Sequence, residues 1–179
     1  MSSPAPCGNV IVETPRLRLR PHRIEDLANY LPIWSKGEPG NPAGFALTEE
    51  EAWYRLLRFA GHWAHFGFGC FVVEDSANDR LIGEAGFAYF HRGLGPQYDD
   101  APEGAWRVLA EYRGKGIASE AMTAAVQWLD SQGKGARTVC IIDPANAASI
   151  KVAGRIGFRE FLRKDYKGAP VILFERIGR

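Results

Sequence analysis

The sequence has 179 residues, of which 46% are hydrophobic and 24% charged, and 22 Lys and Arg against 21 Asp and Glu give a formal charge of +1. This length fits one well-cored domain, and the composition excludes extensive disorder. The nearly balanced charge gives no global basic surface for nucleic acid, and no apolar run reaches the length of a membrane span.

The N-terminus and the cysteines favour a cytoplasmic protein. Residues 1–9 lack the basic and apolar regions of a secretory signal, and we expect a flexible leader there, followed by a single domain over 10–179. Cys7, Cys70 and Cys140 are widely spaced and odd in number. This pattern favours reduced thiols over a disulfide framework or a zinc site.

The first predicted elements are a strand and a helix. Residues 16–20 alternate as a half-buried strand does. The spacing over 24–34 is helical, with a break near Pro32. Residues 35–47 are rich in glycine and proline and predict a loop.

A second helix begins at a capping box. Thr48, with Glu51 three residues later, is typical of a helix start, and the helical pattern ends near Phe66. Five apolar residues on one face of this helix are predicted to be buried: Ala52, Leu56, Phe59, Ala60 and Trp63.

A β-hairpin and a long loop follow. Residues 70–74 and 81–90 are apolar segments on either side of a polar turn, which predicts two antiparallel strands. Residues 91–104 are predicted to form a loop, and loops of that length in a compact domain are often functional.

The stretch over 106–133 reads as a short strand, a glycine-bearing turn and an amphipathic helix closed by Gly133. The remaining elements are a strand over 137–143, a helix over 147–156 ended by glycine, and two strands over 158–167 and 170–177. Together these elements predict an α+β fold with a mixed sheet.

The turn before the amphipathic helix is suited to an anion. The first N–H groups of a helix have no internal partner, and the macrodipole makes that end electropositive. Glycines at 114 and 116 let the backbone approach a ligand closely, and Arg113 and Lys115 add positive charge. We therefore predict a phosphate site there.

Of three phosphate-binding motifs, two fail. A Walker A loop requires Ser or Thr after its lysine, whereas Lys115 is followed by Gly116. A dinucleotide-binding turn requires Gly or Ala where Ser119 stands, and it normally opens a parallel sheet, whereas a β-meander precedes this turn. The pyrophosphate turn of acyl-CoA-dependent N-acetyltransferases, [QR]-x-x-G-x-[GA], matches residues 113–118 at every fixed position.

With this match the chain resembles the GNAT superfamily and, within it, the RimJ/RimL-like branch of ribosomal-protein-alanine acetyltransferases. The resemblance covers almost the whole chain and implies a single-domain fold. Its central, mostly antiparallel sheet would splay at the CoA site and be flanked by helices. Five segments carry it in the same order: TPRLRLRPHRIED, HWAHFGFGCFVV, LIGEAGF, EGAWRVLAEYRGKGIASEA, and Asn146-Ala147-Ala148-Ser149 with Gly157-Phe158.

The resemblance also implies which residues bind acetyl-CoA as the co-substrate, without a metal. The main chain of Val108 and Ala110 would bond the pantetheine arm in the splayed gap. Asn146 and Ser149 would contact the pantetheine or the thioester. The pyrophosphate would lie against the turn and the helix start, at Arg113, Gly114, Lys115, Gly116, Ile117 and Ala118.

The family's usual reaction is direct attack of a neutral amine on the thioester, which needs a base for the amine and an acid for the departing thiolate. Many members carry the acid as a tyrosine, at the position where this chain has Ala153. Ser149, one turn earlier, is the substitute that the RimJ/RimL-like pattern suggests. We expect Glu103 to be the base, with Glu84 as the alternative.

Several of these residues also have structural interpretations. Asn146 is a common helix cap, Ser149 could be plain helix surface, and Glu103 could be a solvated carboxylate. Cys140 is predicted to be a buried structural thiol rather than a nucleophile.

Two further groups are predicted to be structural. His62 and His65 lie three residues apart, one short of the spacing seen in metal-binding helices. Five aromatic residues are expected to be mostly core, with some lining an acceptor pocket: Trp34, Trp53, Trp63, Phe66 and Phe68.

The sequence thus predicts an N-acetyltransferase that moves the acetyl group of acetyl-CoA to a primary amine. The acceptor would be a protein N-terminal α-amino group or a small-molecule amine. A non-catalytic CoA sensor or interaction module with the same fold is the alternative from another class. The missing tyrosine favours that alternative, and the Asn146/Ser149 pair favours the enzyme. We expect no DNA or membrane partner, and a monomer or homodimer.

Overall fold

The computed structural model describes residues 10–34 and 46–178. The predicted leader over 1–9 and most of the predicted loop over 35–47 lie outside the described residues. No helix in the described ranges combines the length and the apolar character that crossing a membrane requires.

Within these ranges, eight strands form one sheet in the order β1-β2-β3-β4-β5-β6-β8-β7. The strands are β1 (Val12–Glu13), β2 (Leu17–Arg20), β3 (Cys70–Asp75), β4 (Arg80–Ala88), β5 (Glu103–Val108), β6 (Arg137–Ile142), β7 (Arg159–Tyr166) and β8 (Ala169–Ile177). All neighbours are antiparallel except β5 and β6, which run parallel. The predicted α+β fold with a mixed, mostly antiparallel sheet is confirmed.

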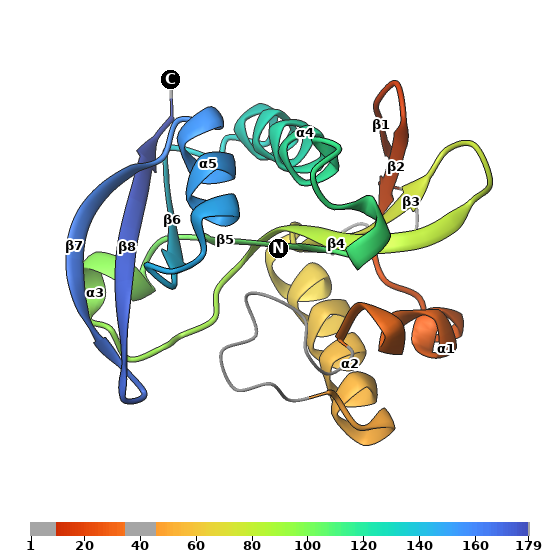
Figure 1. Ribbon diagram of the computed structural model, residues 1–179, viewed down its shortest axis with the longest axis horizontal. Helices are drawn as coiled ribbons and strands as arrows, with labels where there is room; N and C mark the ends of the chain where they lie inside the picture. The colour runs from red at the N-terminus through yellow and green to blue at the C-terminus, as the bar shows by residue number, and fades with distance from the viewer. Residues whose placement is uncertain (1–9, 35–45, 179) are drawn as a thin grey trace.

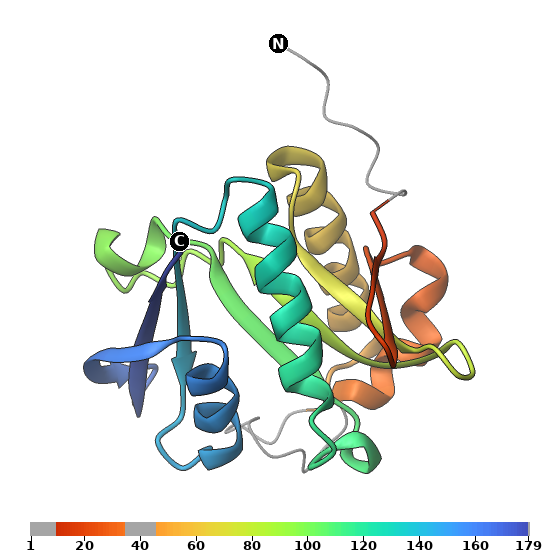
Figure 2. The ribbon, with the colours of Figure 1, turned by 90° about the horizontal axis from the view of Figure 1, so that it is seen from above.

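Helices cover both faces of the sheet. The helices are α1 (Leu27–Tyr30), α2 (Glu49–Phe66), α3 (Pro96–Asp99), α4 (Ile117–Ser131) and α5 (Ala147–Arg155), with 3₁₀ turns η2 (Ile24–Asp26), η3 (Leu31–Trp34) and η4 (Ala110–Tyr112). Figure 1 shows α1 and α2 below the sheet and α4 and α5 above it. Seen from above, α4 runs across the sheet beside α5 (Figure 2).

The helix α2 begins at the predicted capping box. The Thr48 hydroxyl accepts from the Glu51 N–H at 3.2 Å, and the Glu51 carboxylate accepts from the Thr48 N–H at 2.8 Å. Four of the five predicted core residues of α2 are buried, but Ala60 is exposed. The prediction for Ala60 is wrong because this residue lies at the margin of the apolar stripe, on its solvent side.

The predicted loop over 91–104 is also partly wrong. Its middle forms α3, and its last two residues are already in β5, which begins at Glu103. A charged residue and a glycine at the start of β5 conceal the strand pattern in the sequence. Glu103 can be buried in the strand because Arg92, 11 residues earlier, pairs with it.

The main hydrophobic core takes side chains from both faces of the sheet, from α1 and α2 on one and from α4 on the other. The inward face of α4 is almost completely covered, since Ala121, Met122, Ala125 and Leu129 are each at most 1% exposed. The same cluster contains side chains from β3 and β4 and, on the other side of α4, from β6 and β8. The helix α4 therefore joins the two halves of the sheet through side-chain packing.

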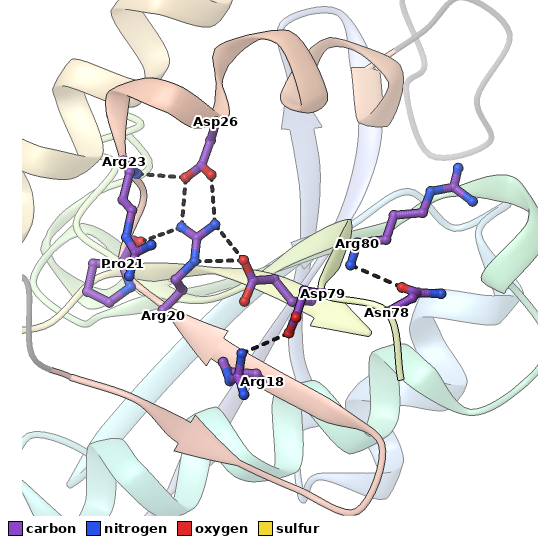
Figure 3. Close-up of polar contacts among 9 residues, drawn as sticks. Arg18, Arg20, Pro21, Arg23, Asp26, Asn78, Asp79 and Arg80 are labelled. Carbon is purple, nitrogen blue, oxygen red and sulfur yellow. Dashed lines mark hydrogen bonds and ion pairs between the residues drawn. The ribbon is translucent and has the colours of Figure 1, made fainter. Parts of the chain in front are cut away.

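A buried ion cluster fixes η2 against the sheet. The Arg20 guanidinium donates two hydrogen bonds to Asp26, at 2.7 and 2.8 Å, and one to Glu74 at 2.8 Å (Figure 3). All three side chains are buried, so each charge needs this partner. The cluster positions the start of the α1 segment over β2 and β3.

The pairing between β5 and β6 is interrupted. In the described part of the chain their register consists of the single pair Glu103–Val139, and the Val139 N–H donates to the Pro102 carbonyl at 3.0 Å. Beyond this point the two strands separate. The splay that the family resemblance implies is therefore present between these strands.

Candidate functional site

The turn before α4 presents a row of unused backbone donors. Gly114 and Gly116 have left-handed φ values of +72° and +78°, which glycine adopts without strain. No acceptor among the residues that the structure describes meets the N–H groups of residues 114–118. A Cβ added at Gly114 would meet nothing within 4 Å, so space is open beside these donors. This geometry suits an anion.

A brace from the β1–β2 turn holds this turn in place. The Arg16 guanidinium donates to the Lys115 carbonyl at 3.0 Å and to Glu120, in the first turn of α4, at 2.7 Å. The Thr14 hydroxyl donates to the other oxygen of Glu120 at 2.6 Å. Nothing in the local sequence pattern predicts this brace, because its two sides are about 100 residues apart.

Removal of the brace should loosen the turn. We expect Arg16→Gln to lower the affinity for CoA about fivefold, since one exposed charge-assisted contact contributes on the order of 1 kcal/mol. Calorimetric titration with CoA measures the change. Arg18→Gln is the matched control, because Arg18 pairs instead with exposed Asp79 on the hairpin. Equal affinities for the two variants would contradict the role of Arg16.

The gap between β5 and β6 is lined by main chain. The Leu109 N–H donates to the Ile82 carbonyl of the β4 side at 2.8 Å. Because backbone groups alternate along a strand, those of Trp106 and Val108 point to the β6 side. Val108 thus lies where it was predicted. Trp106, which was not predicted to take part, presents its backbone groups to the gap in the same way.

Ala110 lies outside the strand that was predicted to contain it. It begins η4, and its carbonyl accepts from the Arg113 N–H at 3.1 Å. Its carbonyl is therefore occupied, and only its N–H is left for a ligand. The predicted contact of Ala110 with the pantetheine arm is reduced to that donor.

The start of α5 brings Asn146 and Ser149 together. The Asn146 side-chain oxygen caps the helix by accepting from the Ser149 N–H at 3.0 Å, so the structural role of Asn146 is present. Ser149 is half-buried, and its hydroxyl has no hydrogen-bond partner in the described ranges. Ala153 is completely buried and carries no ionisable group, so that position supplies no acid.

Glu103 is a buried strand residue and not a loop carboxylate. It is 3% exposed, and both of its oxygens accept from the Arg92 guanidinium at 2.6 Å. Burial raises the pKa of the Glu103 carboxyl, and Arg92 opposes this rise. A proton taken up by Glu103 would weaken its ion pair with Arg92.

Glu84 is the hub of a second buried network. It accepts from the Arg55 guanidinium at 2.5 Å and from the Tyr30 hydroxyl, and Arg55 also donates to the Tyr30 oxygen at 2.6 Å. Burial on its own raises the pKa of Glu84, but Arg55 reverses this and holds it well below its usual value. Glu84 connects β4 to α1 and α2.

Of the residues expected to be structural, His62, Cys70 and Cys140 are buried, whereas His65 is exposed. The His62 imidazole makes two hydrogen bonds, to the Phe68 carbonyl at 2.7 Å and from the Tyr89 N–H at 2.9 Å. Cys70 and Cys140 are buried free thiols, and burial raises the pKa of both, which makes them poor nucleophiles. Cys7 lies outside the described residues. Among those residues no cluster suited to a metal ion is present.

Of the five aromatic residues that were expected to be mostly core, two are buried in the core and the other three are half-buried or exposed. Trp63 and Phe68 are 2% exposed, Trp34 and Trp53 are half-buried, and Phe66 is 42% exposed. Trp34 lies beside the guanidinium groups of Arg55 and Arg107.

A cavity of about 220 Å³ lies next to the buried ion cluster of Arg20. The charged groups that line it already have partners. Arg20 binds Asp26 and Glu74, and Asp79 binds Arg18 (Figure 3). Arg80 binds Glu111. We assign no ligand to this cavity.

Comparison with known proteins connects this geometry to a family. The family model described as an acetyltransferase (GNAT) domain matches residues 16–159. A GnaT-family acetyltransferase from Bordetella pertussis is 33% identical, with a TM-score of 0.86 over 94% of this chain and 99% of that one. The Bacillus subtilis protein YkkB is 27% identical over 116 residues, which span 62% of this chain and 62% of that relative's length.

A solved structure of RimL, a ribosomal L7/L12 α-N-protein acetyltransferase in complex with coenzyme A, also has this fold. It is 17% identical, with a TM-score of 0.75 over 94% of this chain and 98% of that one. At this identity the likeness establishes the fold alone.

Proposed function

Because this chain belongs to the GNAT acetyltransferase family, we propose that it transfers the acetyl group of acetyl-CoA to a primary amine by direct attack in a ternary complex. The observation that carries this proposal is the turn before α4, where the N–H groups of residues 114–118 meet no acceptor in the described chain and follow the end of β5 that has separated from β6. We propose that Gly114, Gly116 and Ala118 hold the pyrophosphate with their N–H groups.

The other proposed contacts with acetyl-CoA follow from the same position of the turn. Arg113, Lys115 and Ile117 complete the pyrophosphate turn, and the side chains of Arg113 and Lys115 add positive charge. The backbone of Val108, with the N–H of Ala110, is proposed to bond the pantetheine arm.

Acetyl-CoA, when bound, supplies the activated acyl group as a thioester. The main-chain N–H near Val108 is proposed to bind the carbonyl oxygen as it gains negative charge. Asn146, held at the start of α5, is proposed to contact the pantetheine with its free amide hydrogens. The buried state of Cys140 supports a mechanism without an acyl-enzyme.

Ser149 is the proposed acid for the departing thiolate, because its half-buried hydroxyl is not committed elsewhere in the described chain. Glu103 is the proposed base. The pKa of Glu103 is raised by burial, whereas Arg55 holds the pKa of Glu84 below its usual value. The lower basicity of Glu84 makes it the weaker alternative.

The acceptor and the branch within the family belong to this proposal as well. The five segments that resemble RimJ/RimL-like proteins favour a protein N-terminal α-amino group, and a small-molecule amine is the other acceptor class. A cytoplasmic monomer or homodimer, without a DNA or membrane partner, is consistent with the composition.

The test is thiol release from acetyl-CoA against a panel of amines and N-terminal peptides. Acceptor-dependent release supports the enzyme. Tight binding of CoA with no release on any acceptor would instead support a sensor or interaction module with this fold.

Ser149→Ala should lower kcat about 100-fold while the fold stays intact, since a positioned general acid contributes two or more powers of ten. The KM for acetyl-CoA should change little, because the capping contact of Ser149 uses its backbone N–H. Steady-state kinetics and thermal melting measure both effects. Ser131→Ala, at the exposed end of α4, is the control. A wild-type kcat for Ser149→Ala would remove this residue as the acid.

A further inference from the structure

A buried acid–base cluster lies at the closed end of the β5–β6 gap. Glu103 and Val139 are the register partners that close the gap, so their side chains lie on the same face of the sheet. Tyr98, on α3, packs against Val139 in a small core cluster and is 2% exposed. In the proposed function, the donor enters at the turn over 113–118 and follows β5 toward this end.

The hydroxyl of Tyr98 is buried, and no group in the described chain forms a hydrogen bond of ordinary length and direction with it. It is nevertheless close to the Glu103 carboxyl. Burial raises the pKa of Glu103, and Arg92 and then the Tyr98 hydroxyl oppose this rise. Burial also raises the pKa of Tyr98 above its ordinary value, and the Glu103 charge adds to this. A buried hydroxyl without a hydrogen bond costs stability, so this one calls for an explanation other than packing.

Two contacts hold α3 on either side of Tyr98. The Asp99 carboxylate accepts from the Gly95 N–H at 2.9 Å. The Gln97 carbonyl accepts from the Arg137 guanidinium at 2.6 Å. The Tyr98 ring is therefore fixed beside Glu103 by its own short helix.

Arg92 and Tyr98 differ in what they offer to Glu103. A guanidinium only donates hydrogen bonds, so Arg92 stabilises the carboxylate but not the neutral acid. A phenol both donates and accepts, so Tyr98 can donate to the carboxylate and can accept from the protonated acid. A general base passes through both states in every turnover. Of these two partners, only Tyr98 can serve both.

We propose that Tyr98 is a positioning residue for the base Glu103, as a donor in the charged state and as an acceptor in the neutral state. When a Glu103 oxygen takes the proton, an N–H bond of the ammonium breaks, an O–H bond forms, and the amine keeps the electron pair that attacks the thioester. The new O–H then donates to Tyr98 as the pair with Arg92 weakens. Catalytic hydrogen bonds are often poorly aligned in the free enzyme and tighten with substrate bound, which fits the geometry of Tyr98. This inference rests on the proposed function for the role of Glu103.

The other ionisable side chains around the Glu103–Arg92 pair come from five elements: Arg58 on α2, Cys70 on β3, Asp99 on α3, Cys140 on β6 and Tyr166 on β7. Asp99 adds to the rise in the pKa of Glu103. Burial, with a smaller contribution from the Glu103 charge, raises the pKa of both thiols. All these groups are present in the wild type and in a Tyr98 variant, so a difference between the two proteins reports on the Tyr98–Glu103 contact.

Tyr98→Phe removes only the hydroxyl. We expect kcat/KM at neutral pH to fall about tenfold, which is part of the hundredfold or more that a general base contributes. The base must be ionised, so kcat/KM rises with pH as Glu103 loses its proton. Loss of the hydroxyl removes one of the groups that lower the pKa of Glu103, so this rise should move to higher pH. The same acceptor is used for both proteins, and Tyr54→Phe, at a residue that is 60% exposed on α2, is the control.

Thermal melting separates this role from a structural one. Tyr98→Phe should be at least as stable as the wild type, because the hydroxyl has no hydrogen bond to lose. Tyr30→Phe is the comparison, since that buried hydroxyl donates to Glu84 and accepts from Arg55, and this variant should melt at a lower temperature. A less stable Tyr98→Phe with an unchanged pH profile would show a merely structural tyrosine and overturn the proposal.

A titration without turnover separates this inference from the proposed function. The carboxyl carbon signal of Glu103, assigned by its loss in Glu103→Gln, is followed by NMR against pH in the wild type and in Tyr98→Phe. A midpoint at higher pH in Tyr98→Phe supports the contact even if no acceptor releases thiol, and in that case only the proposed function fails. An unchanged midpoint, together with active transfer, refutes the role of Tyr98 and leaves the acetyltransferase intact.

Discussion

Gly116→Asp should lower the affinity for CoA by about 100-fold or more. Two like charges about 4 Å apart at an effective dielectric of about 20 repel by about 4 kcal/mol, and each 1.4 kcal/mol is a factor of ten. Arg16 Nη2 lies 3.7 Å from the position of the added Cβ and can neutralise part of the new charge. We therefore expect less than the full repulsion. Calorimetric titration with CoA measures the change.

Gly116→Asn is the matched control for this experiment. Asparagine has the same shape as aspartate, and both tolerate the left-handed φ of +78° better than most residues. The two variants thus share any backbone strain and differ in charge alone. Affinities for CoA that agree within a factor of two would contradict a pyrophosphate at residues 113–118.

Glu84→Gln should lower the free energy of unfolding by about 3–5 kcal/mol, which is the usual cost of removing one partner from a buried ion pair. The change leaves the Arg55 guanidinium without its counter-charge and disturbs the hydrogen bond from the Tyr30 hydroxyl. Urea unfolding at neutral pH measures the difference. Glu111→Gln, which breaks the exposed pair with Arg80, should unfold like the wild type.

The effect of Glu84→Gln should also depend on pH. Arg55 holds the pKa of Glu84 below its unfolded value, although burial alone acts in the opposite direction. The carboxylate therefore stabilises the fold fully above its unfolded pKa and loses this contribution as the pH falls through the folded pKa. The wild type and the variant should converge in stability in strong acid. A gap that widens with falling pH would refute the charged state of Glu84.

Local features were predictable from the sequence. The capping box at Thr48, the turn before α4 and the cap at Asn146 each depend on neighbours within a few residues, and all three are present. The motif over 113–118 located the row of free donors because helix starts carry them by geometry. The start of β5 was misplaced because its first residue is charged.

The contacts that fix the geometry of the site join residues that are far apart in the sequence. Arg16 braces the turn across about 100 residues, and Glu84 is reached by Tyr30 from 54 positions away. A strand pattern indicates which face a residue lies on but not which distant charge it meets, so the partners of Arg16 and Glu84 could not be chosen from the sequence.

The single register pair between β5 and β6 divides the sheet into two hydrogen-bonded ladders, one of five strands and one of three. Backbone hydrogen bonds between strands are directional and resist bending. The side-chain packing of α4 that joins the two ladders is not directional. The angle between the two ladders can therefore change without breaking a hydrogen bond within either ladder. A ligand that bonds the free edge of β5 would supply hydrogen bonds that β6 does not make and would favour one angle between the two ladders. In this protein the co-substrate would then also be a structural part of the sheet, present only while it is bound.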